Sequence, residues 1–404
     1  MALPLSRCCA WKGRSVFASG ALSACGMFNG RRGRQTHPAG FLLGGDSGAG
    51  TRSVCHGRAL VKEQHLYRKI YLNTTVYKKQ NSLLRTPSRL MCTTRTKCCC
   101  NQMHSDKQYK DPYTLAQKDL KNLYDEIKQQ LAVSSDLKEI CDYYFDGKGK
   151  AFRPMIVVLM AKACNLHHSN SRELLKSQHS VGMIVEMIHT ASLVHDDVID
   201  GSDTRRGKIT VNKIWGERKA ILAGDFVLST ASVALARLGN NSVVSIFTQA
   251  IEDLVRGEFM QLGSKENENE RFVHYLEKTF KKTASLIANS CKAVSILGNC
   301  GPDVQEIAYQ YGRNIGIAFQ LVDDVLDFTS SANQLGKPTA ADLKLGLATG
   351  PVLFACQQSD GVQQTCYLAH QYCQEAIRQI SMLHSSPERD ALIRLTEIVL
   401  TRNK

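Results

Sequence analysis

The sequence predicts an all-α protein, and three observations support that class. From about residue 112 onward, apolar residues recur at intervals of three and four. No stretch alternates polar and apolar residues as a half-buried strand does, and Pro occurs only nine times in 404 residues. The predicted helices span 112–131, 134–145, 151–166, 171–199, 210–238, 242–263, 268–297, 303–329, 341–357, 360–383 and 387–401, with starts at Asp111-Pro112, Ser134 and Thr210. Roughly 290 residues of helical chain can bury one large core, so we predict a single domain over residues 101–404.

Residues 1–100 differ sharply from that domain. They contain 17 Lys and Arg residues against two acids, Asp46 and Glu63, so that the rest of the chain has a net charge close to zero. The segment is rich in Arg and Ser, and has no apolar run long enough to cross a membrane. We therefore predict a mitochondrial presequence followed by a flexible basic segment, and a protein of the mitochondrial matrix. A basic arm that binds nucleic acid is the alternative, but the segment lacks clustered aromatic residues for base stacking.

Three carboxylates close the apolar helix predicted over 171–199. The stretch runs from His195 through Asp196 and Asp197 to Asp200, after an apolar run from Met183 to Val194. Asp196 and Asp200 are four residues apart, so they lie on one face and repel each other. A divalent cation with oxygen ligands would compensate that repulsion.

A second helix repeats this pattern. Asp323, Asp324 and Asp327 end the apolar helix predicted over 303–329, shortly after Gln320. One acidic cluster could be a solvated helix end. Two clusters on apolar helices argue against that interpretation, because a carboxylate on an apolar helix face is costly unless it is neutralised. Two facing clusters predict a site for several Mg²⁺ ions. Since Mg²⁺ is usually held by a few carboxylates together with substrate phosphates, the predicted substrate is a diphosphate.

Basic residues lie near both acidic clusters in the sequence. Gly147 to Pro154 forms a loop before a helix, in which Lys150 and Arg153 are three residues apart, and this predicts an anion site or an ordinary solvated turn. Arg205 and Arg206 follow the first cluster, where they could form salt bridges or, with metal bound to the carboxylates, contact diphosphate. Lys282-Thr283 and Lys337 are weaker candidates, because a lysine is equally at home on a solvated surface.

Taken in order, these motifs resemble those of the all-α trans-isoprenyl diphosphate synthases. The set is GKxxRP, HDDxxD, RRG, KT and QxxDDxxD, and the resemblance covers about residues 112–357. It implies an isoprenoid-synthase-like helical bundle around a central cavity. With the basic presequence, the chain is most similar to mitochondrial long-chain members that make decaprenyl or solanesyl diphosphate for the ubiquinone side chain. The implied reaction joins isopentenyl diphosphate repeatedly to an allylic diphosphate, farnesyl or geranylgeranyl, with Mg²⁺.

The resemblance also implies a role for each matching residue. Asp196, Asp200 and Asp323 would bind Mg²⁺ directly, and Asp197, Asp324 and Asp327 would support them. The allylic diphosphate would contact Arg205, Lys282, Gln320 and Lys337, and isopentenyl diphosphate would contact Lys150, Arg153, His189 and Arg206. Lys282 and Thr283 would shelter the allylic cation. A hydrogen-bonded core histidine is the alternative for His189.

Product length is predicted from two small residues one turn before the first acidic cluster. Ala191 and Ser192 lie five and four residues before Asp196, where bulky aromatics would close a product channel. Small side chains there favour long products, although close helix packing is the alternative explanation. The number of isoprene units and the presequence cleavage site are not encoded in any motif we recognise.

Two departures from the family pattern bear on activity. Leu347 occupies a position where members often have Lys, and about 25 residues of helical sequence are missing near 358/359. The missing Lys fits a subunit that depends on a second synthase subunit in a hetero-oligomer. The missing helical sequence indicates a shortened isoform, in which we expect misplaced last helices and a less stable fold. A non-catalytic subunit or scaffold is one alternative to an active enzyme, and a helical terpene cyclase is another, though a cyclase needs no second diphosphate pocket. We expect no nucleic-acid partner and no transmembrane segment, and leave a peripheral membrane contact open.

Overall fold

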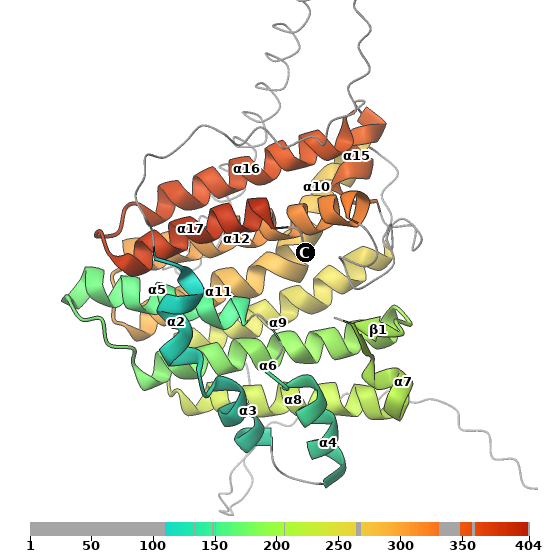
Figure 1. Cartoon of the computed structure of the whole chain (residues 1–404), viewed down its shortest axis with the longest axis horizontal. Coiled ribbons are helices and arrows are strands. Elements are labelled where there is room, and N and C mark those ends of the chain that lie inside the picture. The colour runs from blue at the N-terminus through green and yellow to red at the C-terminus, as the bar shows by residue number, and fades with distance from the viewer. Residues whose placement is uncertain are drawn as a thin grey trace, which may run out of the picture. The chain divides into compact units, whose positions relative to one another are not determined.

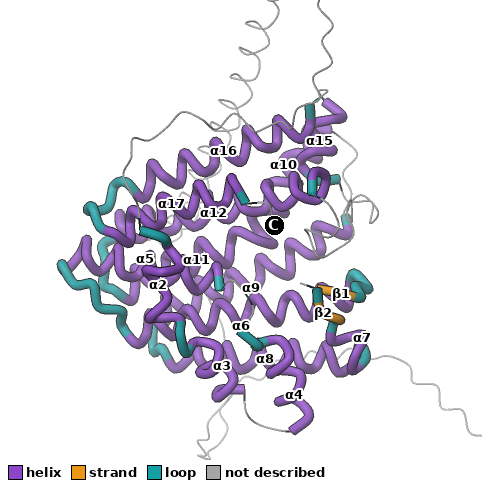
Figure 2. Tube along the Cα trace, viewed as in Figure 1, coloured by secondary structure: helices purple, strands orange, loops and turns teal. Residues whose placement is uncertain are grey.

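The computed structural model describes residues 110–131, 135–147, 149, 151–205, 207–263, 268–330, 348–357 and 360–402. Within these ranges most residues are helical, as Figure 2 shows, which confirms the all-α prediction. The predicted presequence and basic segment, residues 1–100, lie outside them. One departure is a small antiparallel hairpin, in which β1 (Thr204–Arg205) pairs with β2 (Lys208–Ile209). The sequence predicted no strand, because two residues are too few to show an alternating pattern.

The helix bounds follow the predicted ranges closely. The elements are α2 (Pro112–Leu120), α3 (Leu123–Leu131), α4 (Ser135–Tyr144), α5 (Phe152–Ser169), α6 (Lys176–Ile199), α7 (Val211–Trp215), α8 (Glu217–Arg237), α9 (Asn241–Leu262), α10 (Glu268–Thr279), η1 (Phe280–Ala284), α11 (Ser285–Leu297), α12 (Pro302–Thr329), α15 (Gly350–Gln357), α16 (Gly361–Ile380) and α17 (Pro387–Thr401). Asp111 caps α2 as predicted, with its carboxylate accepting a hydrogen bond from the Thr114 amide at 2.9 Å.

Three predicted boundaries were wrong. The helix predicted from residue 171 begins at Lys176, because Asn170 adopts a left-handed conformation that ends α5 and Leu175 is extended. The helix predicted over 210–238 is divided into α7 and α8 at Gly216, whose φ of 85° is incompatible with a right-handed helix. The helix predicted over 112–131 is interrupted by a turn between α2 and α3.

The helix predicted over 268–297 contains an unpredicted change of geometry. It consists of α10, the five-residue π-helix η1 and α11 in direct succession. A π-helix has hydrogen bonds between residues five apart rather than four, and it occurs mostly as single turns at functional sites. The Lys282-Thr283 pair identified in the sequence lies in this turn.

Two long helices organise the packing of the domain. α6 packs against α5, α8 and α11, while α12 packs against α11 and α16 (Figure 1). Ile184 and Met187 of α6 are completely buried, as are Ile315 and Leu321 of α12. Because both helices are anchored by apolar side chains, their C-terminal ends can present polar groups at fixed positions.

The C-terminal helices, for which a shortened isoform predicted misplacement, pack against the rest of the domain. α16 lies along α12, and α17 contacts α5, α12 and α16. The predicted point of shortening, residues 358/359, falls outside the described residues, as do 341–347 of the predicted helix 341–357. The effect of the shortening on activity therefore stays a prediction.

By length and composition, one helix among the described residues, α8, could cross a membrane. α8 packs against α6, the helix that ends in the first acidic cluster, and so forms part of the bundle. Several of its apolar side chains nevertheless face outward, including Leu222, which is 62% exposed, and Val233, which is 50% exposed. This outward face is available for contact with another surface.

Candidate active site

The first acidic cluster lies at the C-terminal end of α6. Asp196 is in the last turn of the helix, and the Asp200 amide donates to the Asp196 carbonyl at 2.8 Å, so the two side chains are one turn apart. Burial raises the pKa of Asp196 to about 6, with Glu258 and Asp200 adding to the shift and Lys282 opposing it. The pKa of Asp200 is also raised, again mainly by burial. These carboxylates are therefore crowded and incompletely neutralised by protein cations.

Asp197 has a different environment from its neighbours. It is buried, and its carboxylate accepts hydrogen bonds from Arg205 Nε at 2.6 Å and from the Tyr144 hydroxyl at 3.1 Å. Arg205 comes from β1, so the hairpin is tied to the end of α6. One of the two alternatives raised for Arg205, a salt bridge to the first acidic cluster, is thus present in the structure.

The second acidic cluster lies at the C-terminal end of α12. Asp323 forms an ion pair with Arg402, with Oδ1 and Nη2 2.8 Å apart. Arg402 also donates to the Phe319 carbonyl at 2.6 Å, and its guanidinium lies 3.7 Å from the Phe319 ring centroid. The residue following α17 therefore reaches the acidic end of α12.

Asp324 and Asp327 face the interior of the bundle. Asp324 is buried and accepts hydrogen bonds from the Tyr275 hydroxyl at 2.5 Å and from Gln320 Nε2 at 2.9 Å. Asp327 is 1% exposed. Within this cluster, Asp323 is thus the carboxylate with the greatest access to solvent.

The π-helical turn η1 lies between the two clusters. Lys282 Nζ is 3.9 Å from Asp196 Oδ2 of α6, while the Thr283 hydroxyl donates to Gln320 Oε1 of α12 at 2.8 Å. Since Gln320 in turn contacts Asp324, a continuous set of polar contacts runs from the first cluster to the second. One turn of helix therefore sets the relative positions of groups that are 127 residues apart in the sequence.

Lys282 is also held from α9. Its Nζ lies 2.6 Å from Glu258 Oε2 and 3.1 Å from Gln261 Oε1. The other carboxylate oxygen of Glu258 is buried and has no hydrogen-bond partner among the described residues. Such an orphan acceptor beside Asp196 is a favourable environment for additional positive charge.

The donor set fits a hard divalent cation. No group of three or more His, Cys, Asp or Glu side chains among the described residues is close enough to enclose a metal ion alone. Carboxylate oxygens are nevertheless concentrated at the ends of α6 and α12, and Mg²⁺ usually takes only one or two carboxylates, with phosphate oxygens completing its shell. The residues present therefore fit a cation whose shell a phosphorylated substrate would complete.

The predicted second anion site is described only in part. Arg153 lies in the first turn of α5, after Ala151 in a left-handed conformation, and His189 is half-buried on α6. The Phe152 ring packs 4.9 Å from the Phe319 ring, which brings the start of α5 next to α12. The predicted ligands Lys150, Arg206 and Lys337 lie outside the described residues, so their positions stay predictions.

The two predicted chain-length residues differ in exposure. Ala191 is 1% exposed, and the half-buried Ser192 donates its hydroxyl to the His189 carbonyl at 2.9 Å. A cavity of about 660 Å³ lies beside Tyr113, Tyr124 and Gly149, and a smaller one of about 110 Å³ lies between α6 and the hairpin. Neither lining includes Ala191 or Ser192, so their role in product length stays a prediction.

Comparison with known proteins identifies the family. The model of the family described as polyprenyl synthetase matches residues 134–383, which is more than half of the chain. The chain belongs to the polyprenyl synthetase family. It is therefore an enzyme of the prenyl-transferring class with the all-α isoprenoid synthase fold, as the resemblance implied.

Curated relatives agree with this membership. The human all trans-polyprenyl-diphosphate synthase PDSS1 is 67% identical over 332 residues, which cover 75% of this chain and 80% of the relative. The decaprenyl-diphosphate synthase subunit 1 of Schizosaccharomyces pombe is 42% identical over 343 residues, covering 72% of this chain and 91% of the relative. Since 75% of this chain is only about 303 residues, the 332-residue match to the human protein includes about 29 positions without a counterpart here.

Solved structures place the fold in the same family. A polyprenyl synthase from Caulobacter crescentus, complexed with calcium and isoprenyl diphosphate, has a TM-score of 0.67 at 27% identity and covers 72% of this chain and 97% of its own. A decaprenyl diphosphate synthase from Rhodobacter capsulatus has a TM-score of 0.65 at 25% identity, covering 72% and 98%. The family fold thus extends over the described helices.

Sequence reasoning missed several residues of the site. Glu258 and Gln261 contact Lys282, Tyr275 contacts Asp324, and Arg402 contacts Asp323. The only local sign of Glu258 and Gln261 was their spacing of three residues in the helix predicted over 242–263, which places an acid and an amide on one face. The tyrosine and the arginine lie 49 and 79 residues from their partners, so no spacing pattern in the sequence connects them.

Proposed function

We propose that this enzyme joins isopentenyl diphosphate repeatedly to an allylic diphosphate, farnesyl or geranylgeranyl, to make a long all-trans polyprenyl diphosphate for the ubiquinone side chain. The observation that carries the proposal is η1, which holds Lys282 3.9 Å from Asp196 and Thr283 2.8 Å from Gln320. Cationic and hydroxyl groups between two carboxylate clusters suit the departure of a metal-bound diphosphate. The relatives named as decaprenyl or solanesyl synthases support a long product.

Mg²⁺ is the proposed cofactor, held directly by Asp196, Asp200 and Asp323. Asp197 and Asp324 are assigned supporting roles, because both are buried and already hydrogen-bonded to protein donors. Asp327, which is also buried, is assigned with them. When bound, Mg²⁺ would supply positive charge to the oxygens of the leaving diphosphate. The Asp323 carboxylate would then either leave Arg402 to bind the metal or contact both Arg402 and the metal.

We assign one set of polar, mostly basic residues to each of the two substrates. Arg205, Lys282, Gln320 and Lys337 are assigned to the allylic diphosphate, and Lys150, Arg153, His189 and Arg206 to isopentenyl diphosphate. Contacts of Lys282 and Gln320 with the two acidic clusters support the first assignment. The second rests on the family motif and on the half-buried positions of Arg153 and His189.

With both substrates bound, each reaction cycle forms one carbon–carbon bond. The C–O bond of the allylic diphosphate breaks, and the electron pair leaves with the diphosphate held by Lys282 and Arg205. The Thr283 hydroxyl and the backbone carbonyls of η1 shelter the allylic cation by their dipoles. The double bond of isopentenyl diphosphate attacks that carbon, and a proton passes from the new cation to the released diphosphate.

A matrix location and a second synthase subunit complete the proposal. Several relatives are named as mitochondrial, which with the basic N-terminal segment supports the location. The relative from Schizosaccharomyces pombe is named as a subunit 1. In this chain, Leu222 and Phe259 on neighbouring helices are 62% and 71% exposed, and an apolar surface of this kind favours a protein partner.

The decisive experiment is transfer of labelled isopentenyl diphosphate onto farnesyl diphosphate with Mg²⁺. The chain is assayed alone and after co-expression with a second synthase subunit, beside Asp196→Ala in the same two preparations. We expect Mg²⁺-dependent long-chain product that Asp196→Ala abolishes. Product only in the co-expressed preparation would establish partner dependence.

A non-catalytic subunit is the competing function, favoured by the apolar side chains exposed on α8 and α9. It predicts that Asp196→Ala leaves the activity of the co-expressed preparation unchanged. The same result would refute the assignment of the reaction to this chain. Far-ultraviolet circular dichroism of the wild type and of Asp196→Ala checks that an inactive variant is still folded.

A further inference from the structure

The π-helical turn η1 is fastened to α9 by two adjacent lysines. Lys281 Nζ lies 3.2 Å from Asp253 Oδ1, and Lys282 Nζ lies 2.6 Å from Glu258 Oε2. The two acids are five residues apart on α9, so successive lysines of η1 contact successive turns of the neighbouring helix. Only Lys282 lies next to the acidic cluster of α6, at 3.9 Å from Asp196. The proposed reaction therefore assigns no role to the contact between Lys281 and Asp253.

Between these two contacts, the backbones of α9 and η1 approach closely. A Cβ atom placed on Gly257 would lie 2.9 Å from the Lys282 backbone nitrogen and 3.2 Å from the Lys282 Cα. The position of η1 is thus defined by backbone packing at Gly257, with a carboxylate on each side of it along α9. A small change at this contact would move Lys282 and Thr283 together.

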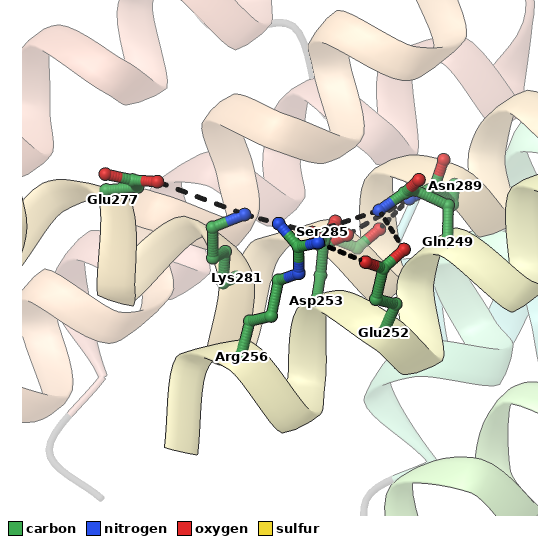
Figure 3. A network of polar contacts seen from close by, with 8 residues as sticks. All are labelled: Gln249, Glu252, Asp253, Arg256, Glu277, Lys281, Ser285 and Asn289. Carbon is green, nitrogen blue, oxygen red and sulfur yellow. Dashed lines mark hydrogen bonds and ion pairs between the residues drawn. The ribbon is translucent and has the colours of Figure 1, made fainter. Parts of the chain in front are cut away.

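Asp253 is the best-connected group at this contact, as Figure 3 shows. It is 6% exposed, and besides Lys281 its carboxylate accepts a hydrogen bond from Ser285 Oγ at 2.6 Å. Asn289 Nδ2 then donates to both the carbonyl and the hydroxyl of Ser285, at 2.9 and 3.1 Å. One buried carboxylate therefore holds a residue within the π-helical turn and the first residue after it.

This arrangement matters because a π-helical turn is not the default geometry. An ordinary sequence of these residue types forms an α-helix, and a single π-helical turn persists where tertiary contacts maintain it. Asp253 of α9 supplies such contacts through Lys281 and Ser285. Lys282 and Thr283, which lie between those two residues in the chain, are then directed toward Asp196 and Gln320.

We propose that Asp253 is a positioning residue that maintains η1 through Lys281 and Ser285, and thereby places Lys282 and Thr283 for the allylic substrate. The inference rests on the proposed function of Lys282 and Thr283. It predicts an effect confined to the allylic half of the reaction, because the described residues assigned to isopentenyl diphosphate, Arg153 and His189, lie on α5 and α6. A purely structural residue would instead change the fraction of folded enzyme and leave both KM values unaltered.

The test uses Asp253→Asn, which keeps the size of the side chain and an acceptor for Ser285 but loses the charge that binds Lys281. The matched control is Glu252→Gln, the neighbouring acid, whose side chain is 46% exposed and pairs with Arg256 at 2.5 Å. Both are made in the full chain, in whichever assembly is active, and the folded fraction is measured by circular dichroism. Steady-state KM values are measured for farnesyl diphosphate and isopentenyl diphosphate, and the Kd of a farnesyl thiolodiphosphate with Mg²⁺ is measured by calorimetry.

For Asp253→Asn we expect KM for farnesyl diphosphate and the Kd of its analogue to rise by about 10-fold, with kcat falling by a similar factor. KM for isopentenyl diphosphate should stay within twofold, and Glu252→Gln should match the wild type in every measurement. Unchanged constants in Asp253→Asn, or a loss of kcat alone in proportion to unfolded protein, would overturn the inference.

A third variant separates this inference from the proposed function. Lys282→Ala is measured in the same assays. If it binds the allylic analogue and turns over like the wild type, the site assignment itself is wrong and the inference falls with it. If Lys282→Ala is impaired while Asp253→Asn is normal, the proposed function stands and only the positioning role of Asp253 is refuted.

Discussion

Replacement of Gly257 by Ala tests directly whether the close approach of α9 and η1 controls catalysis. The added Cβ would lie 2.9 Å from the Lys282 backbone nitrogen, whereas ordinary contacts begin at 3.4 Å, so the two backbones must separate by about 0.5 Å. Because the opposing atoms are backbone, no side-chain rotation can relieve the contact. Overpacking of this kind costs about 1–3 kcal/mol, and the better helix propensity of Ala returns up to about 1 kcal/mol.

The larger effect should be on the reaction. A displacement of 1 Å at a catalytic group can cost about 100-fold in rate, so 0.5 Å at Lys282 and Thr283 should lower kcat about 10-fold. The assays are urea unfolding at 25 °C without metal and steady-state turnover of farnesyl diphosphate with isopentenyl diphosphate. Gly263→Ala at the end of the same helix is the control, since its Cβ would meet nothing closer than 3.8 Å. Wild-type kcat in Gly257→Ala, with stability within 0.5 kcal/mol of the control, would refute the reasoning.

Three further predictions concern the acidic clusters and the product. The pKa of Asp196 is raised from 3.8 to about 6 in the folded protein, so ionisation opposes folding and metal-free stability should fall as pH rises from about 4 to 6. Asp196→Asn should therefore be more stable than the wild type by up to about 3 kcal/mol at pH 8 and by little at pH 4, measured by urea unfolding, and equal stabilities at pH 8 would contradict this. Arg402→Met removes a charge-assisted pair with Asp323 and should lower the free energy of unfolding by about 1–3 kcal/mol without metal, whereas an unchanged value would show that the pair contributes nothing. Ser192→Phe should shorten the products seen by chromatography of the dephosphorylated prenols. The control is Ser180→Phe, at an equally half-buried position near the start of α6, and an unshifted distribution would remove Ser192 from the product channel.

Much of the fold follows from patterns that are local in the sequence. Apolar residues at helical spacing predict the helix over 303–329 to within one residue of α12, because that helix buries a continuous apolar face and starts at a Pro. The two acidic clusters can also be recognised from local sequence, because carboxylates four residues apart on an apolar helix are energetically unfavourable without a compensating charge. Their position at the ends of α6 and α12 is as the sequence predicted.

The missing parts depend on contacts between distant residues. Phe280 to Ala284 has the composition of an ordinary helix, so its π geometry depends on Asp253 and on the backbone of Gly257 rather than on its own residues. The pairing of Arg402 with Asp323 follows from the packing of α17, which no residue near Asp323 encodes. The sequence shows which residue types each helix carries, whereas tertiary packing determines which of their side chains contact one another.

The π-helical turn also holds one residue more than an ordinary helical turn. Each residue of an α-helix turns the chain by about 100°, and the wider π-helical turn takes up one extra residue without rotating the flanking α-helices relative to each other. Removing one residue from 280–284 would therefore replace η1 by an ordinary α-helical turn and keep Tyr275 facing Asp324. Removing one residue from 276–279, outside η1, would instead rotate Tyr275 away from Asp324. Deletions in 276–279 should therefore be far less tolerated for folding than deletions in 280–284, which is a pattern that a library of single-residue deletions would reveal.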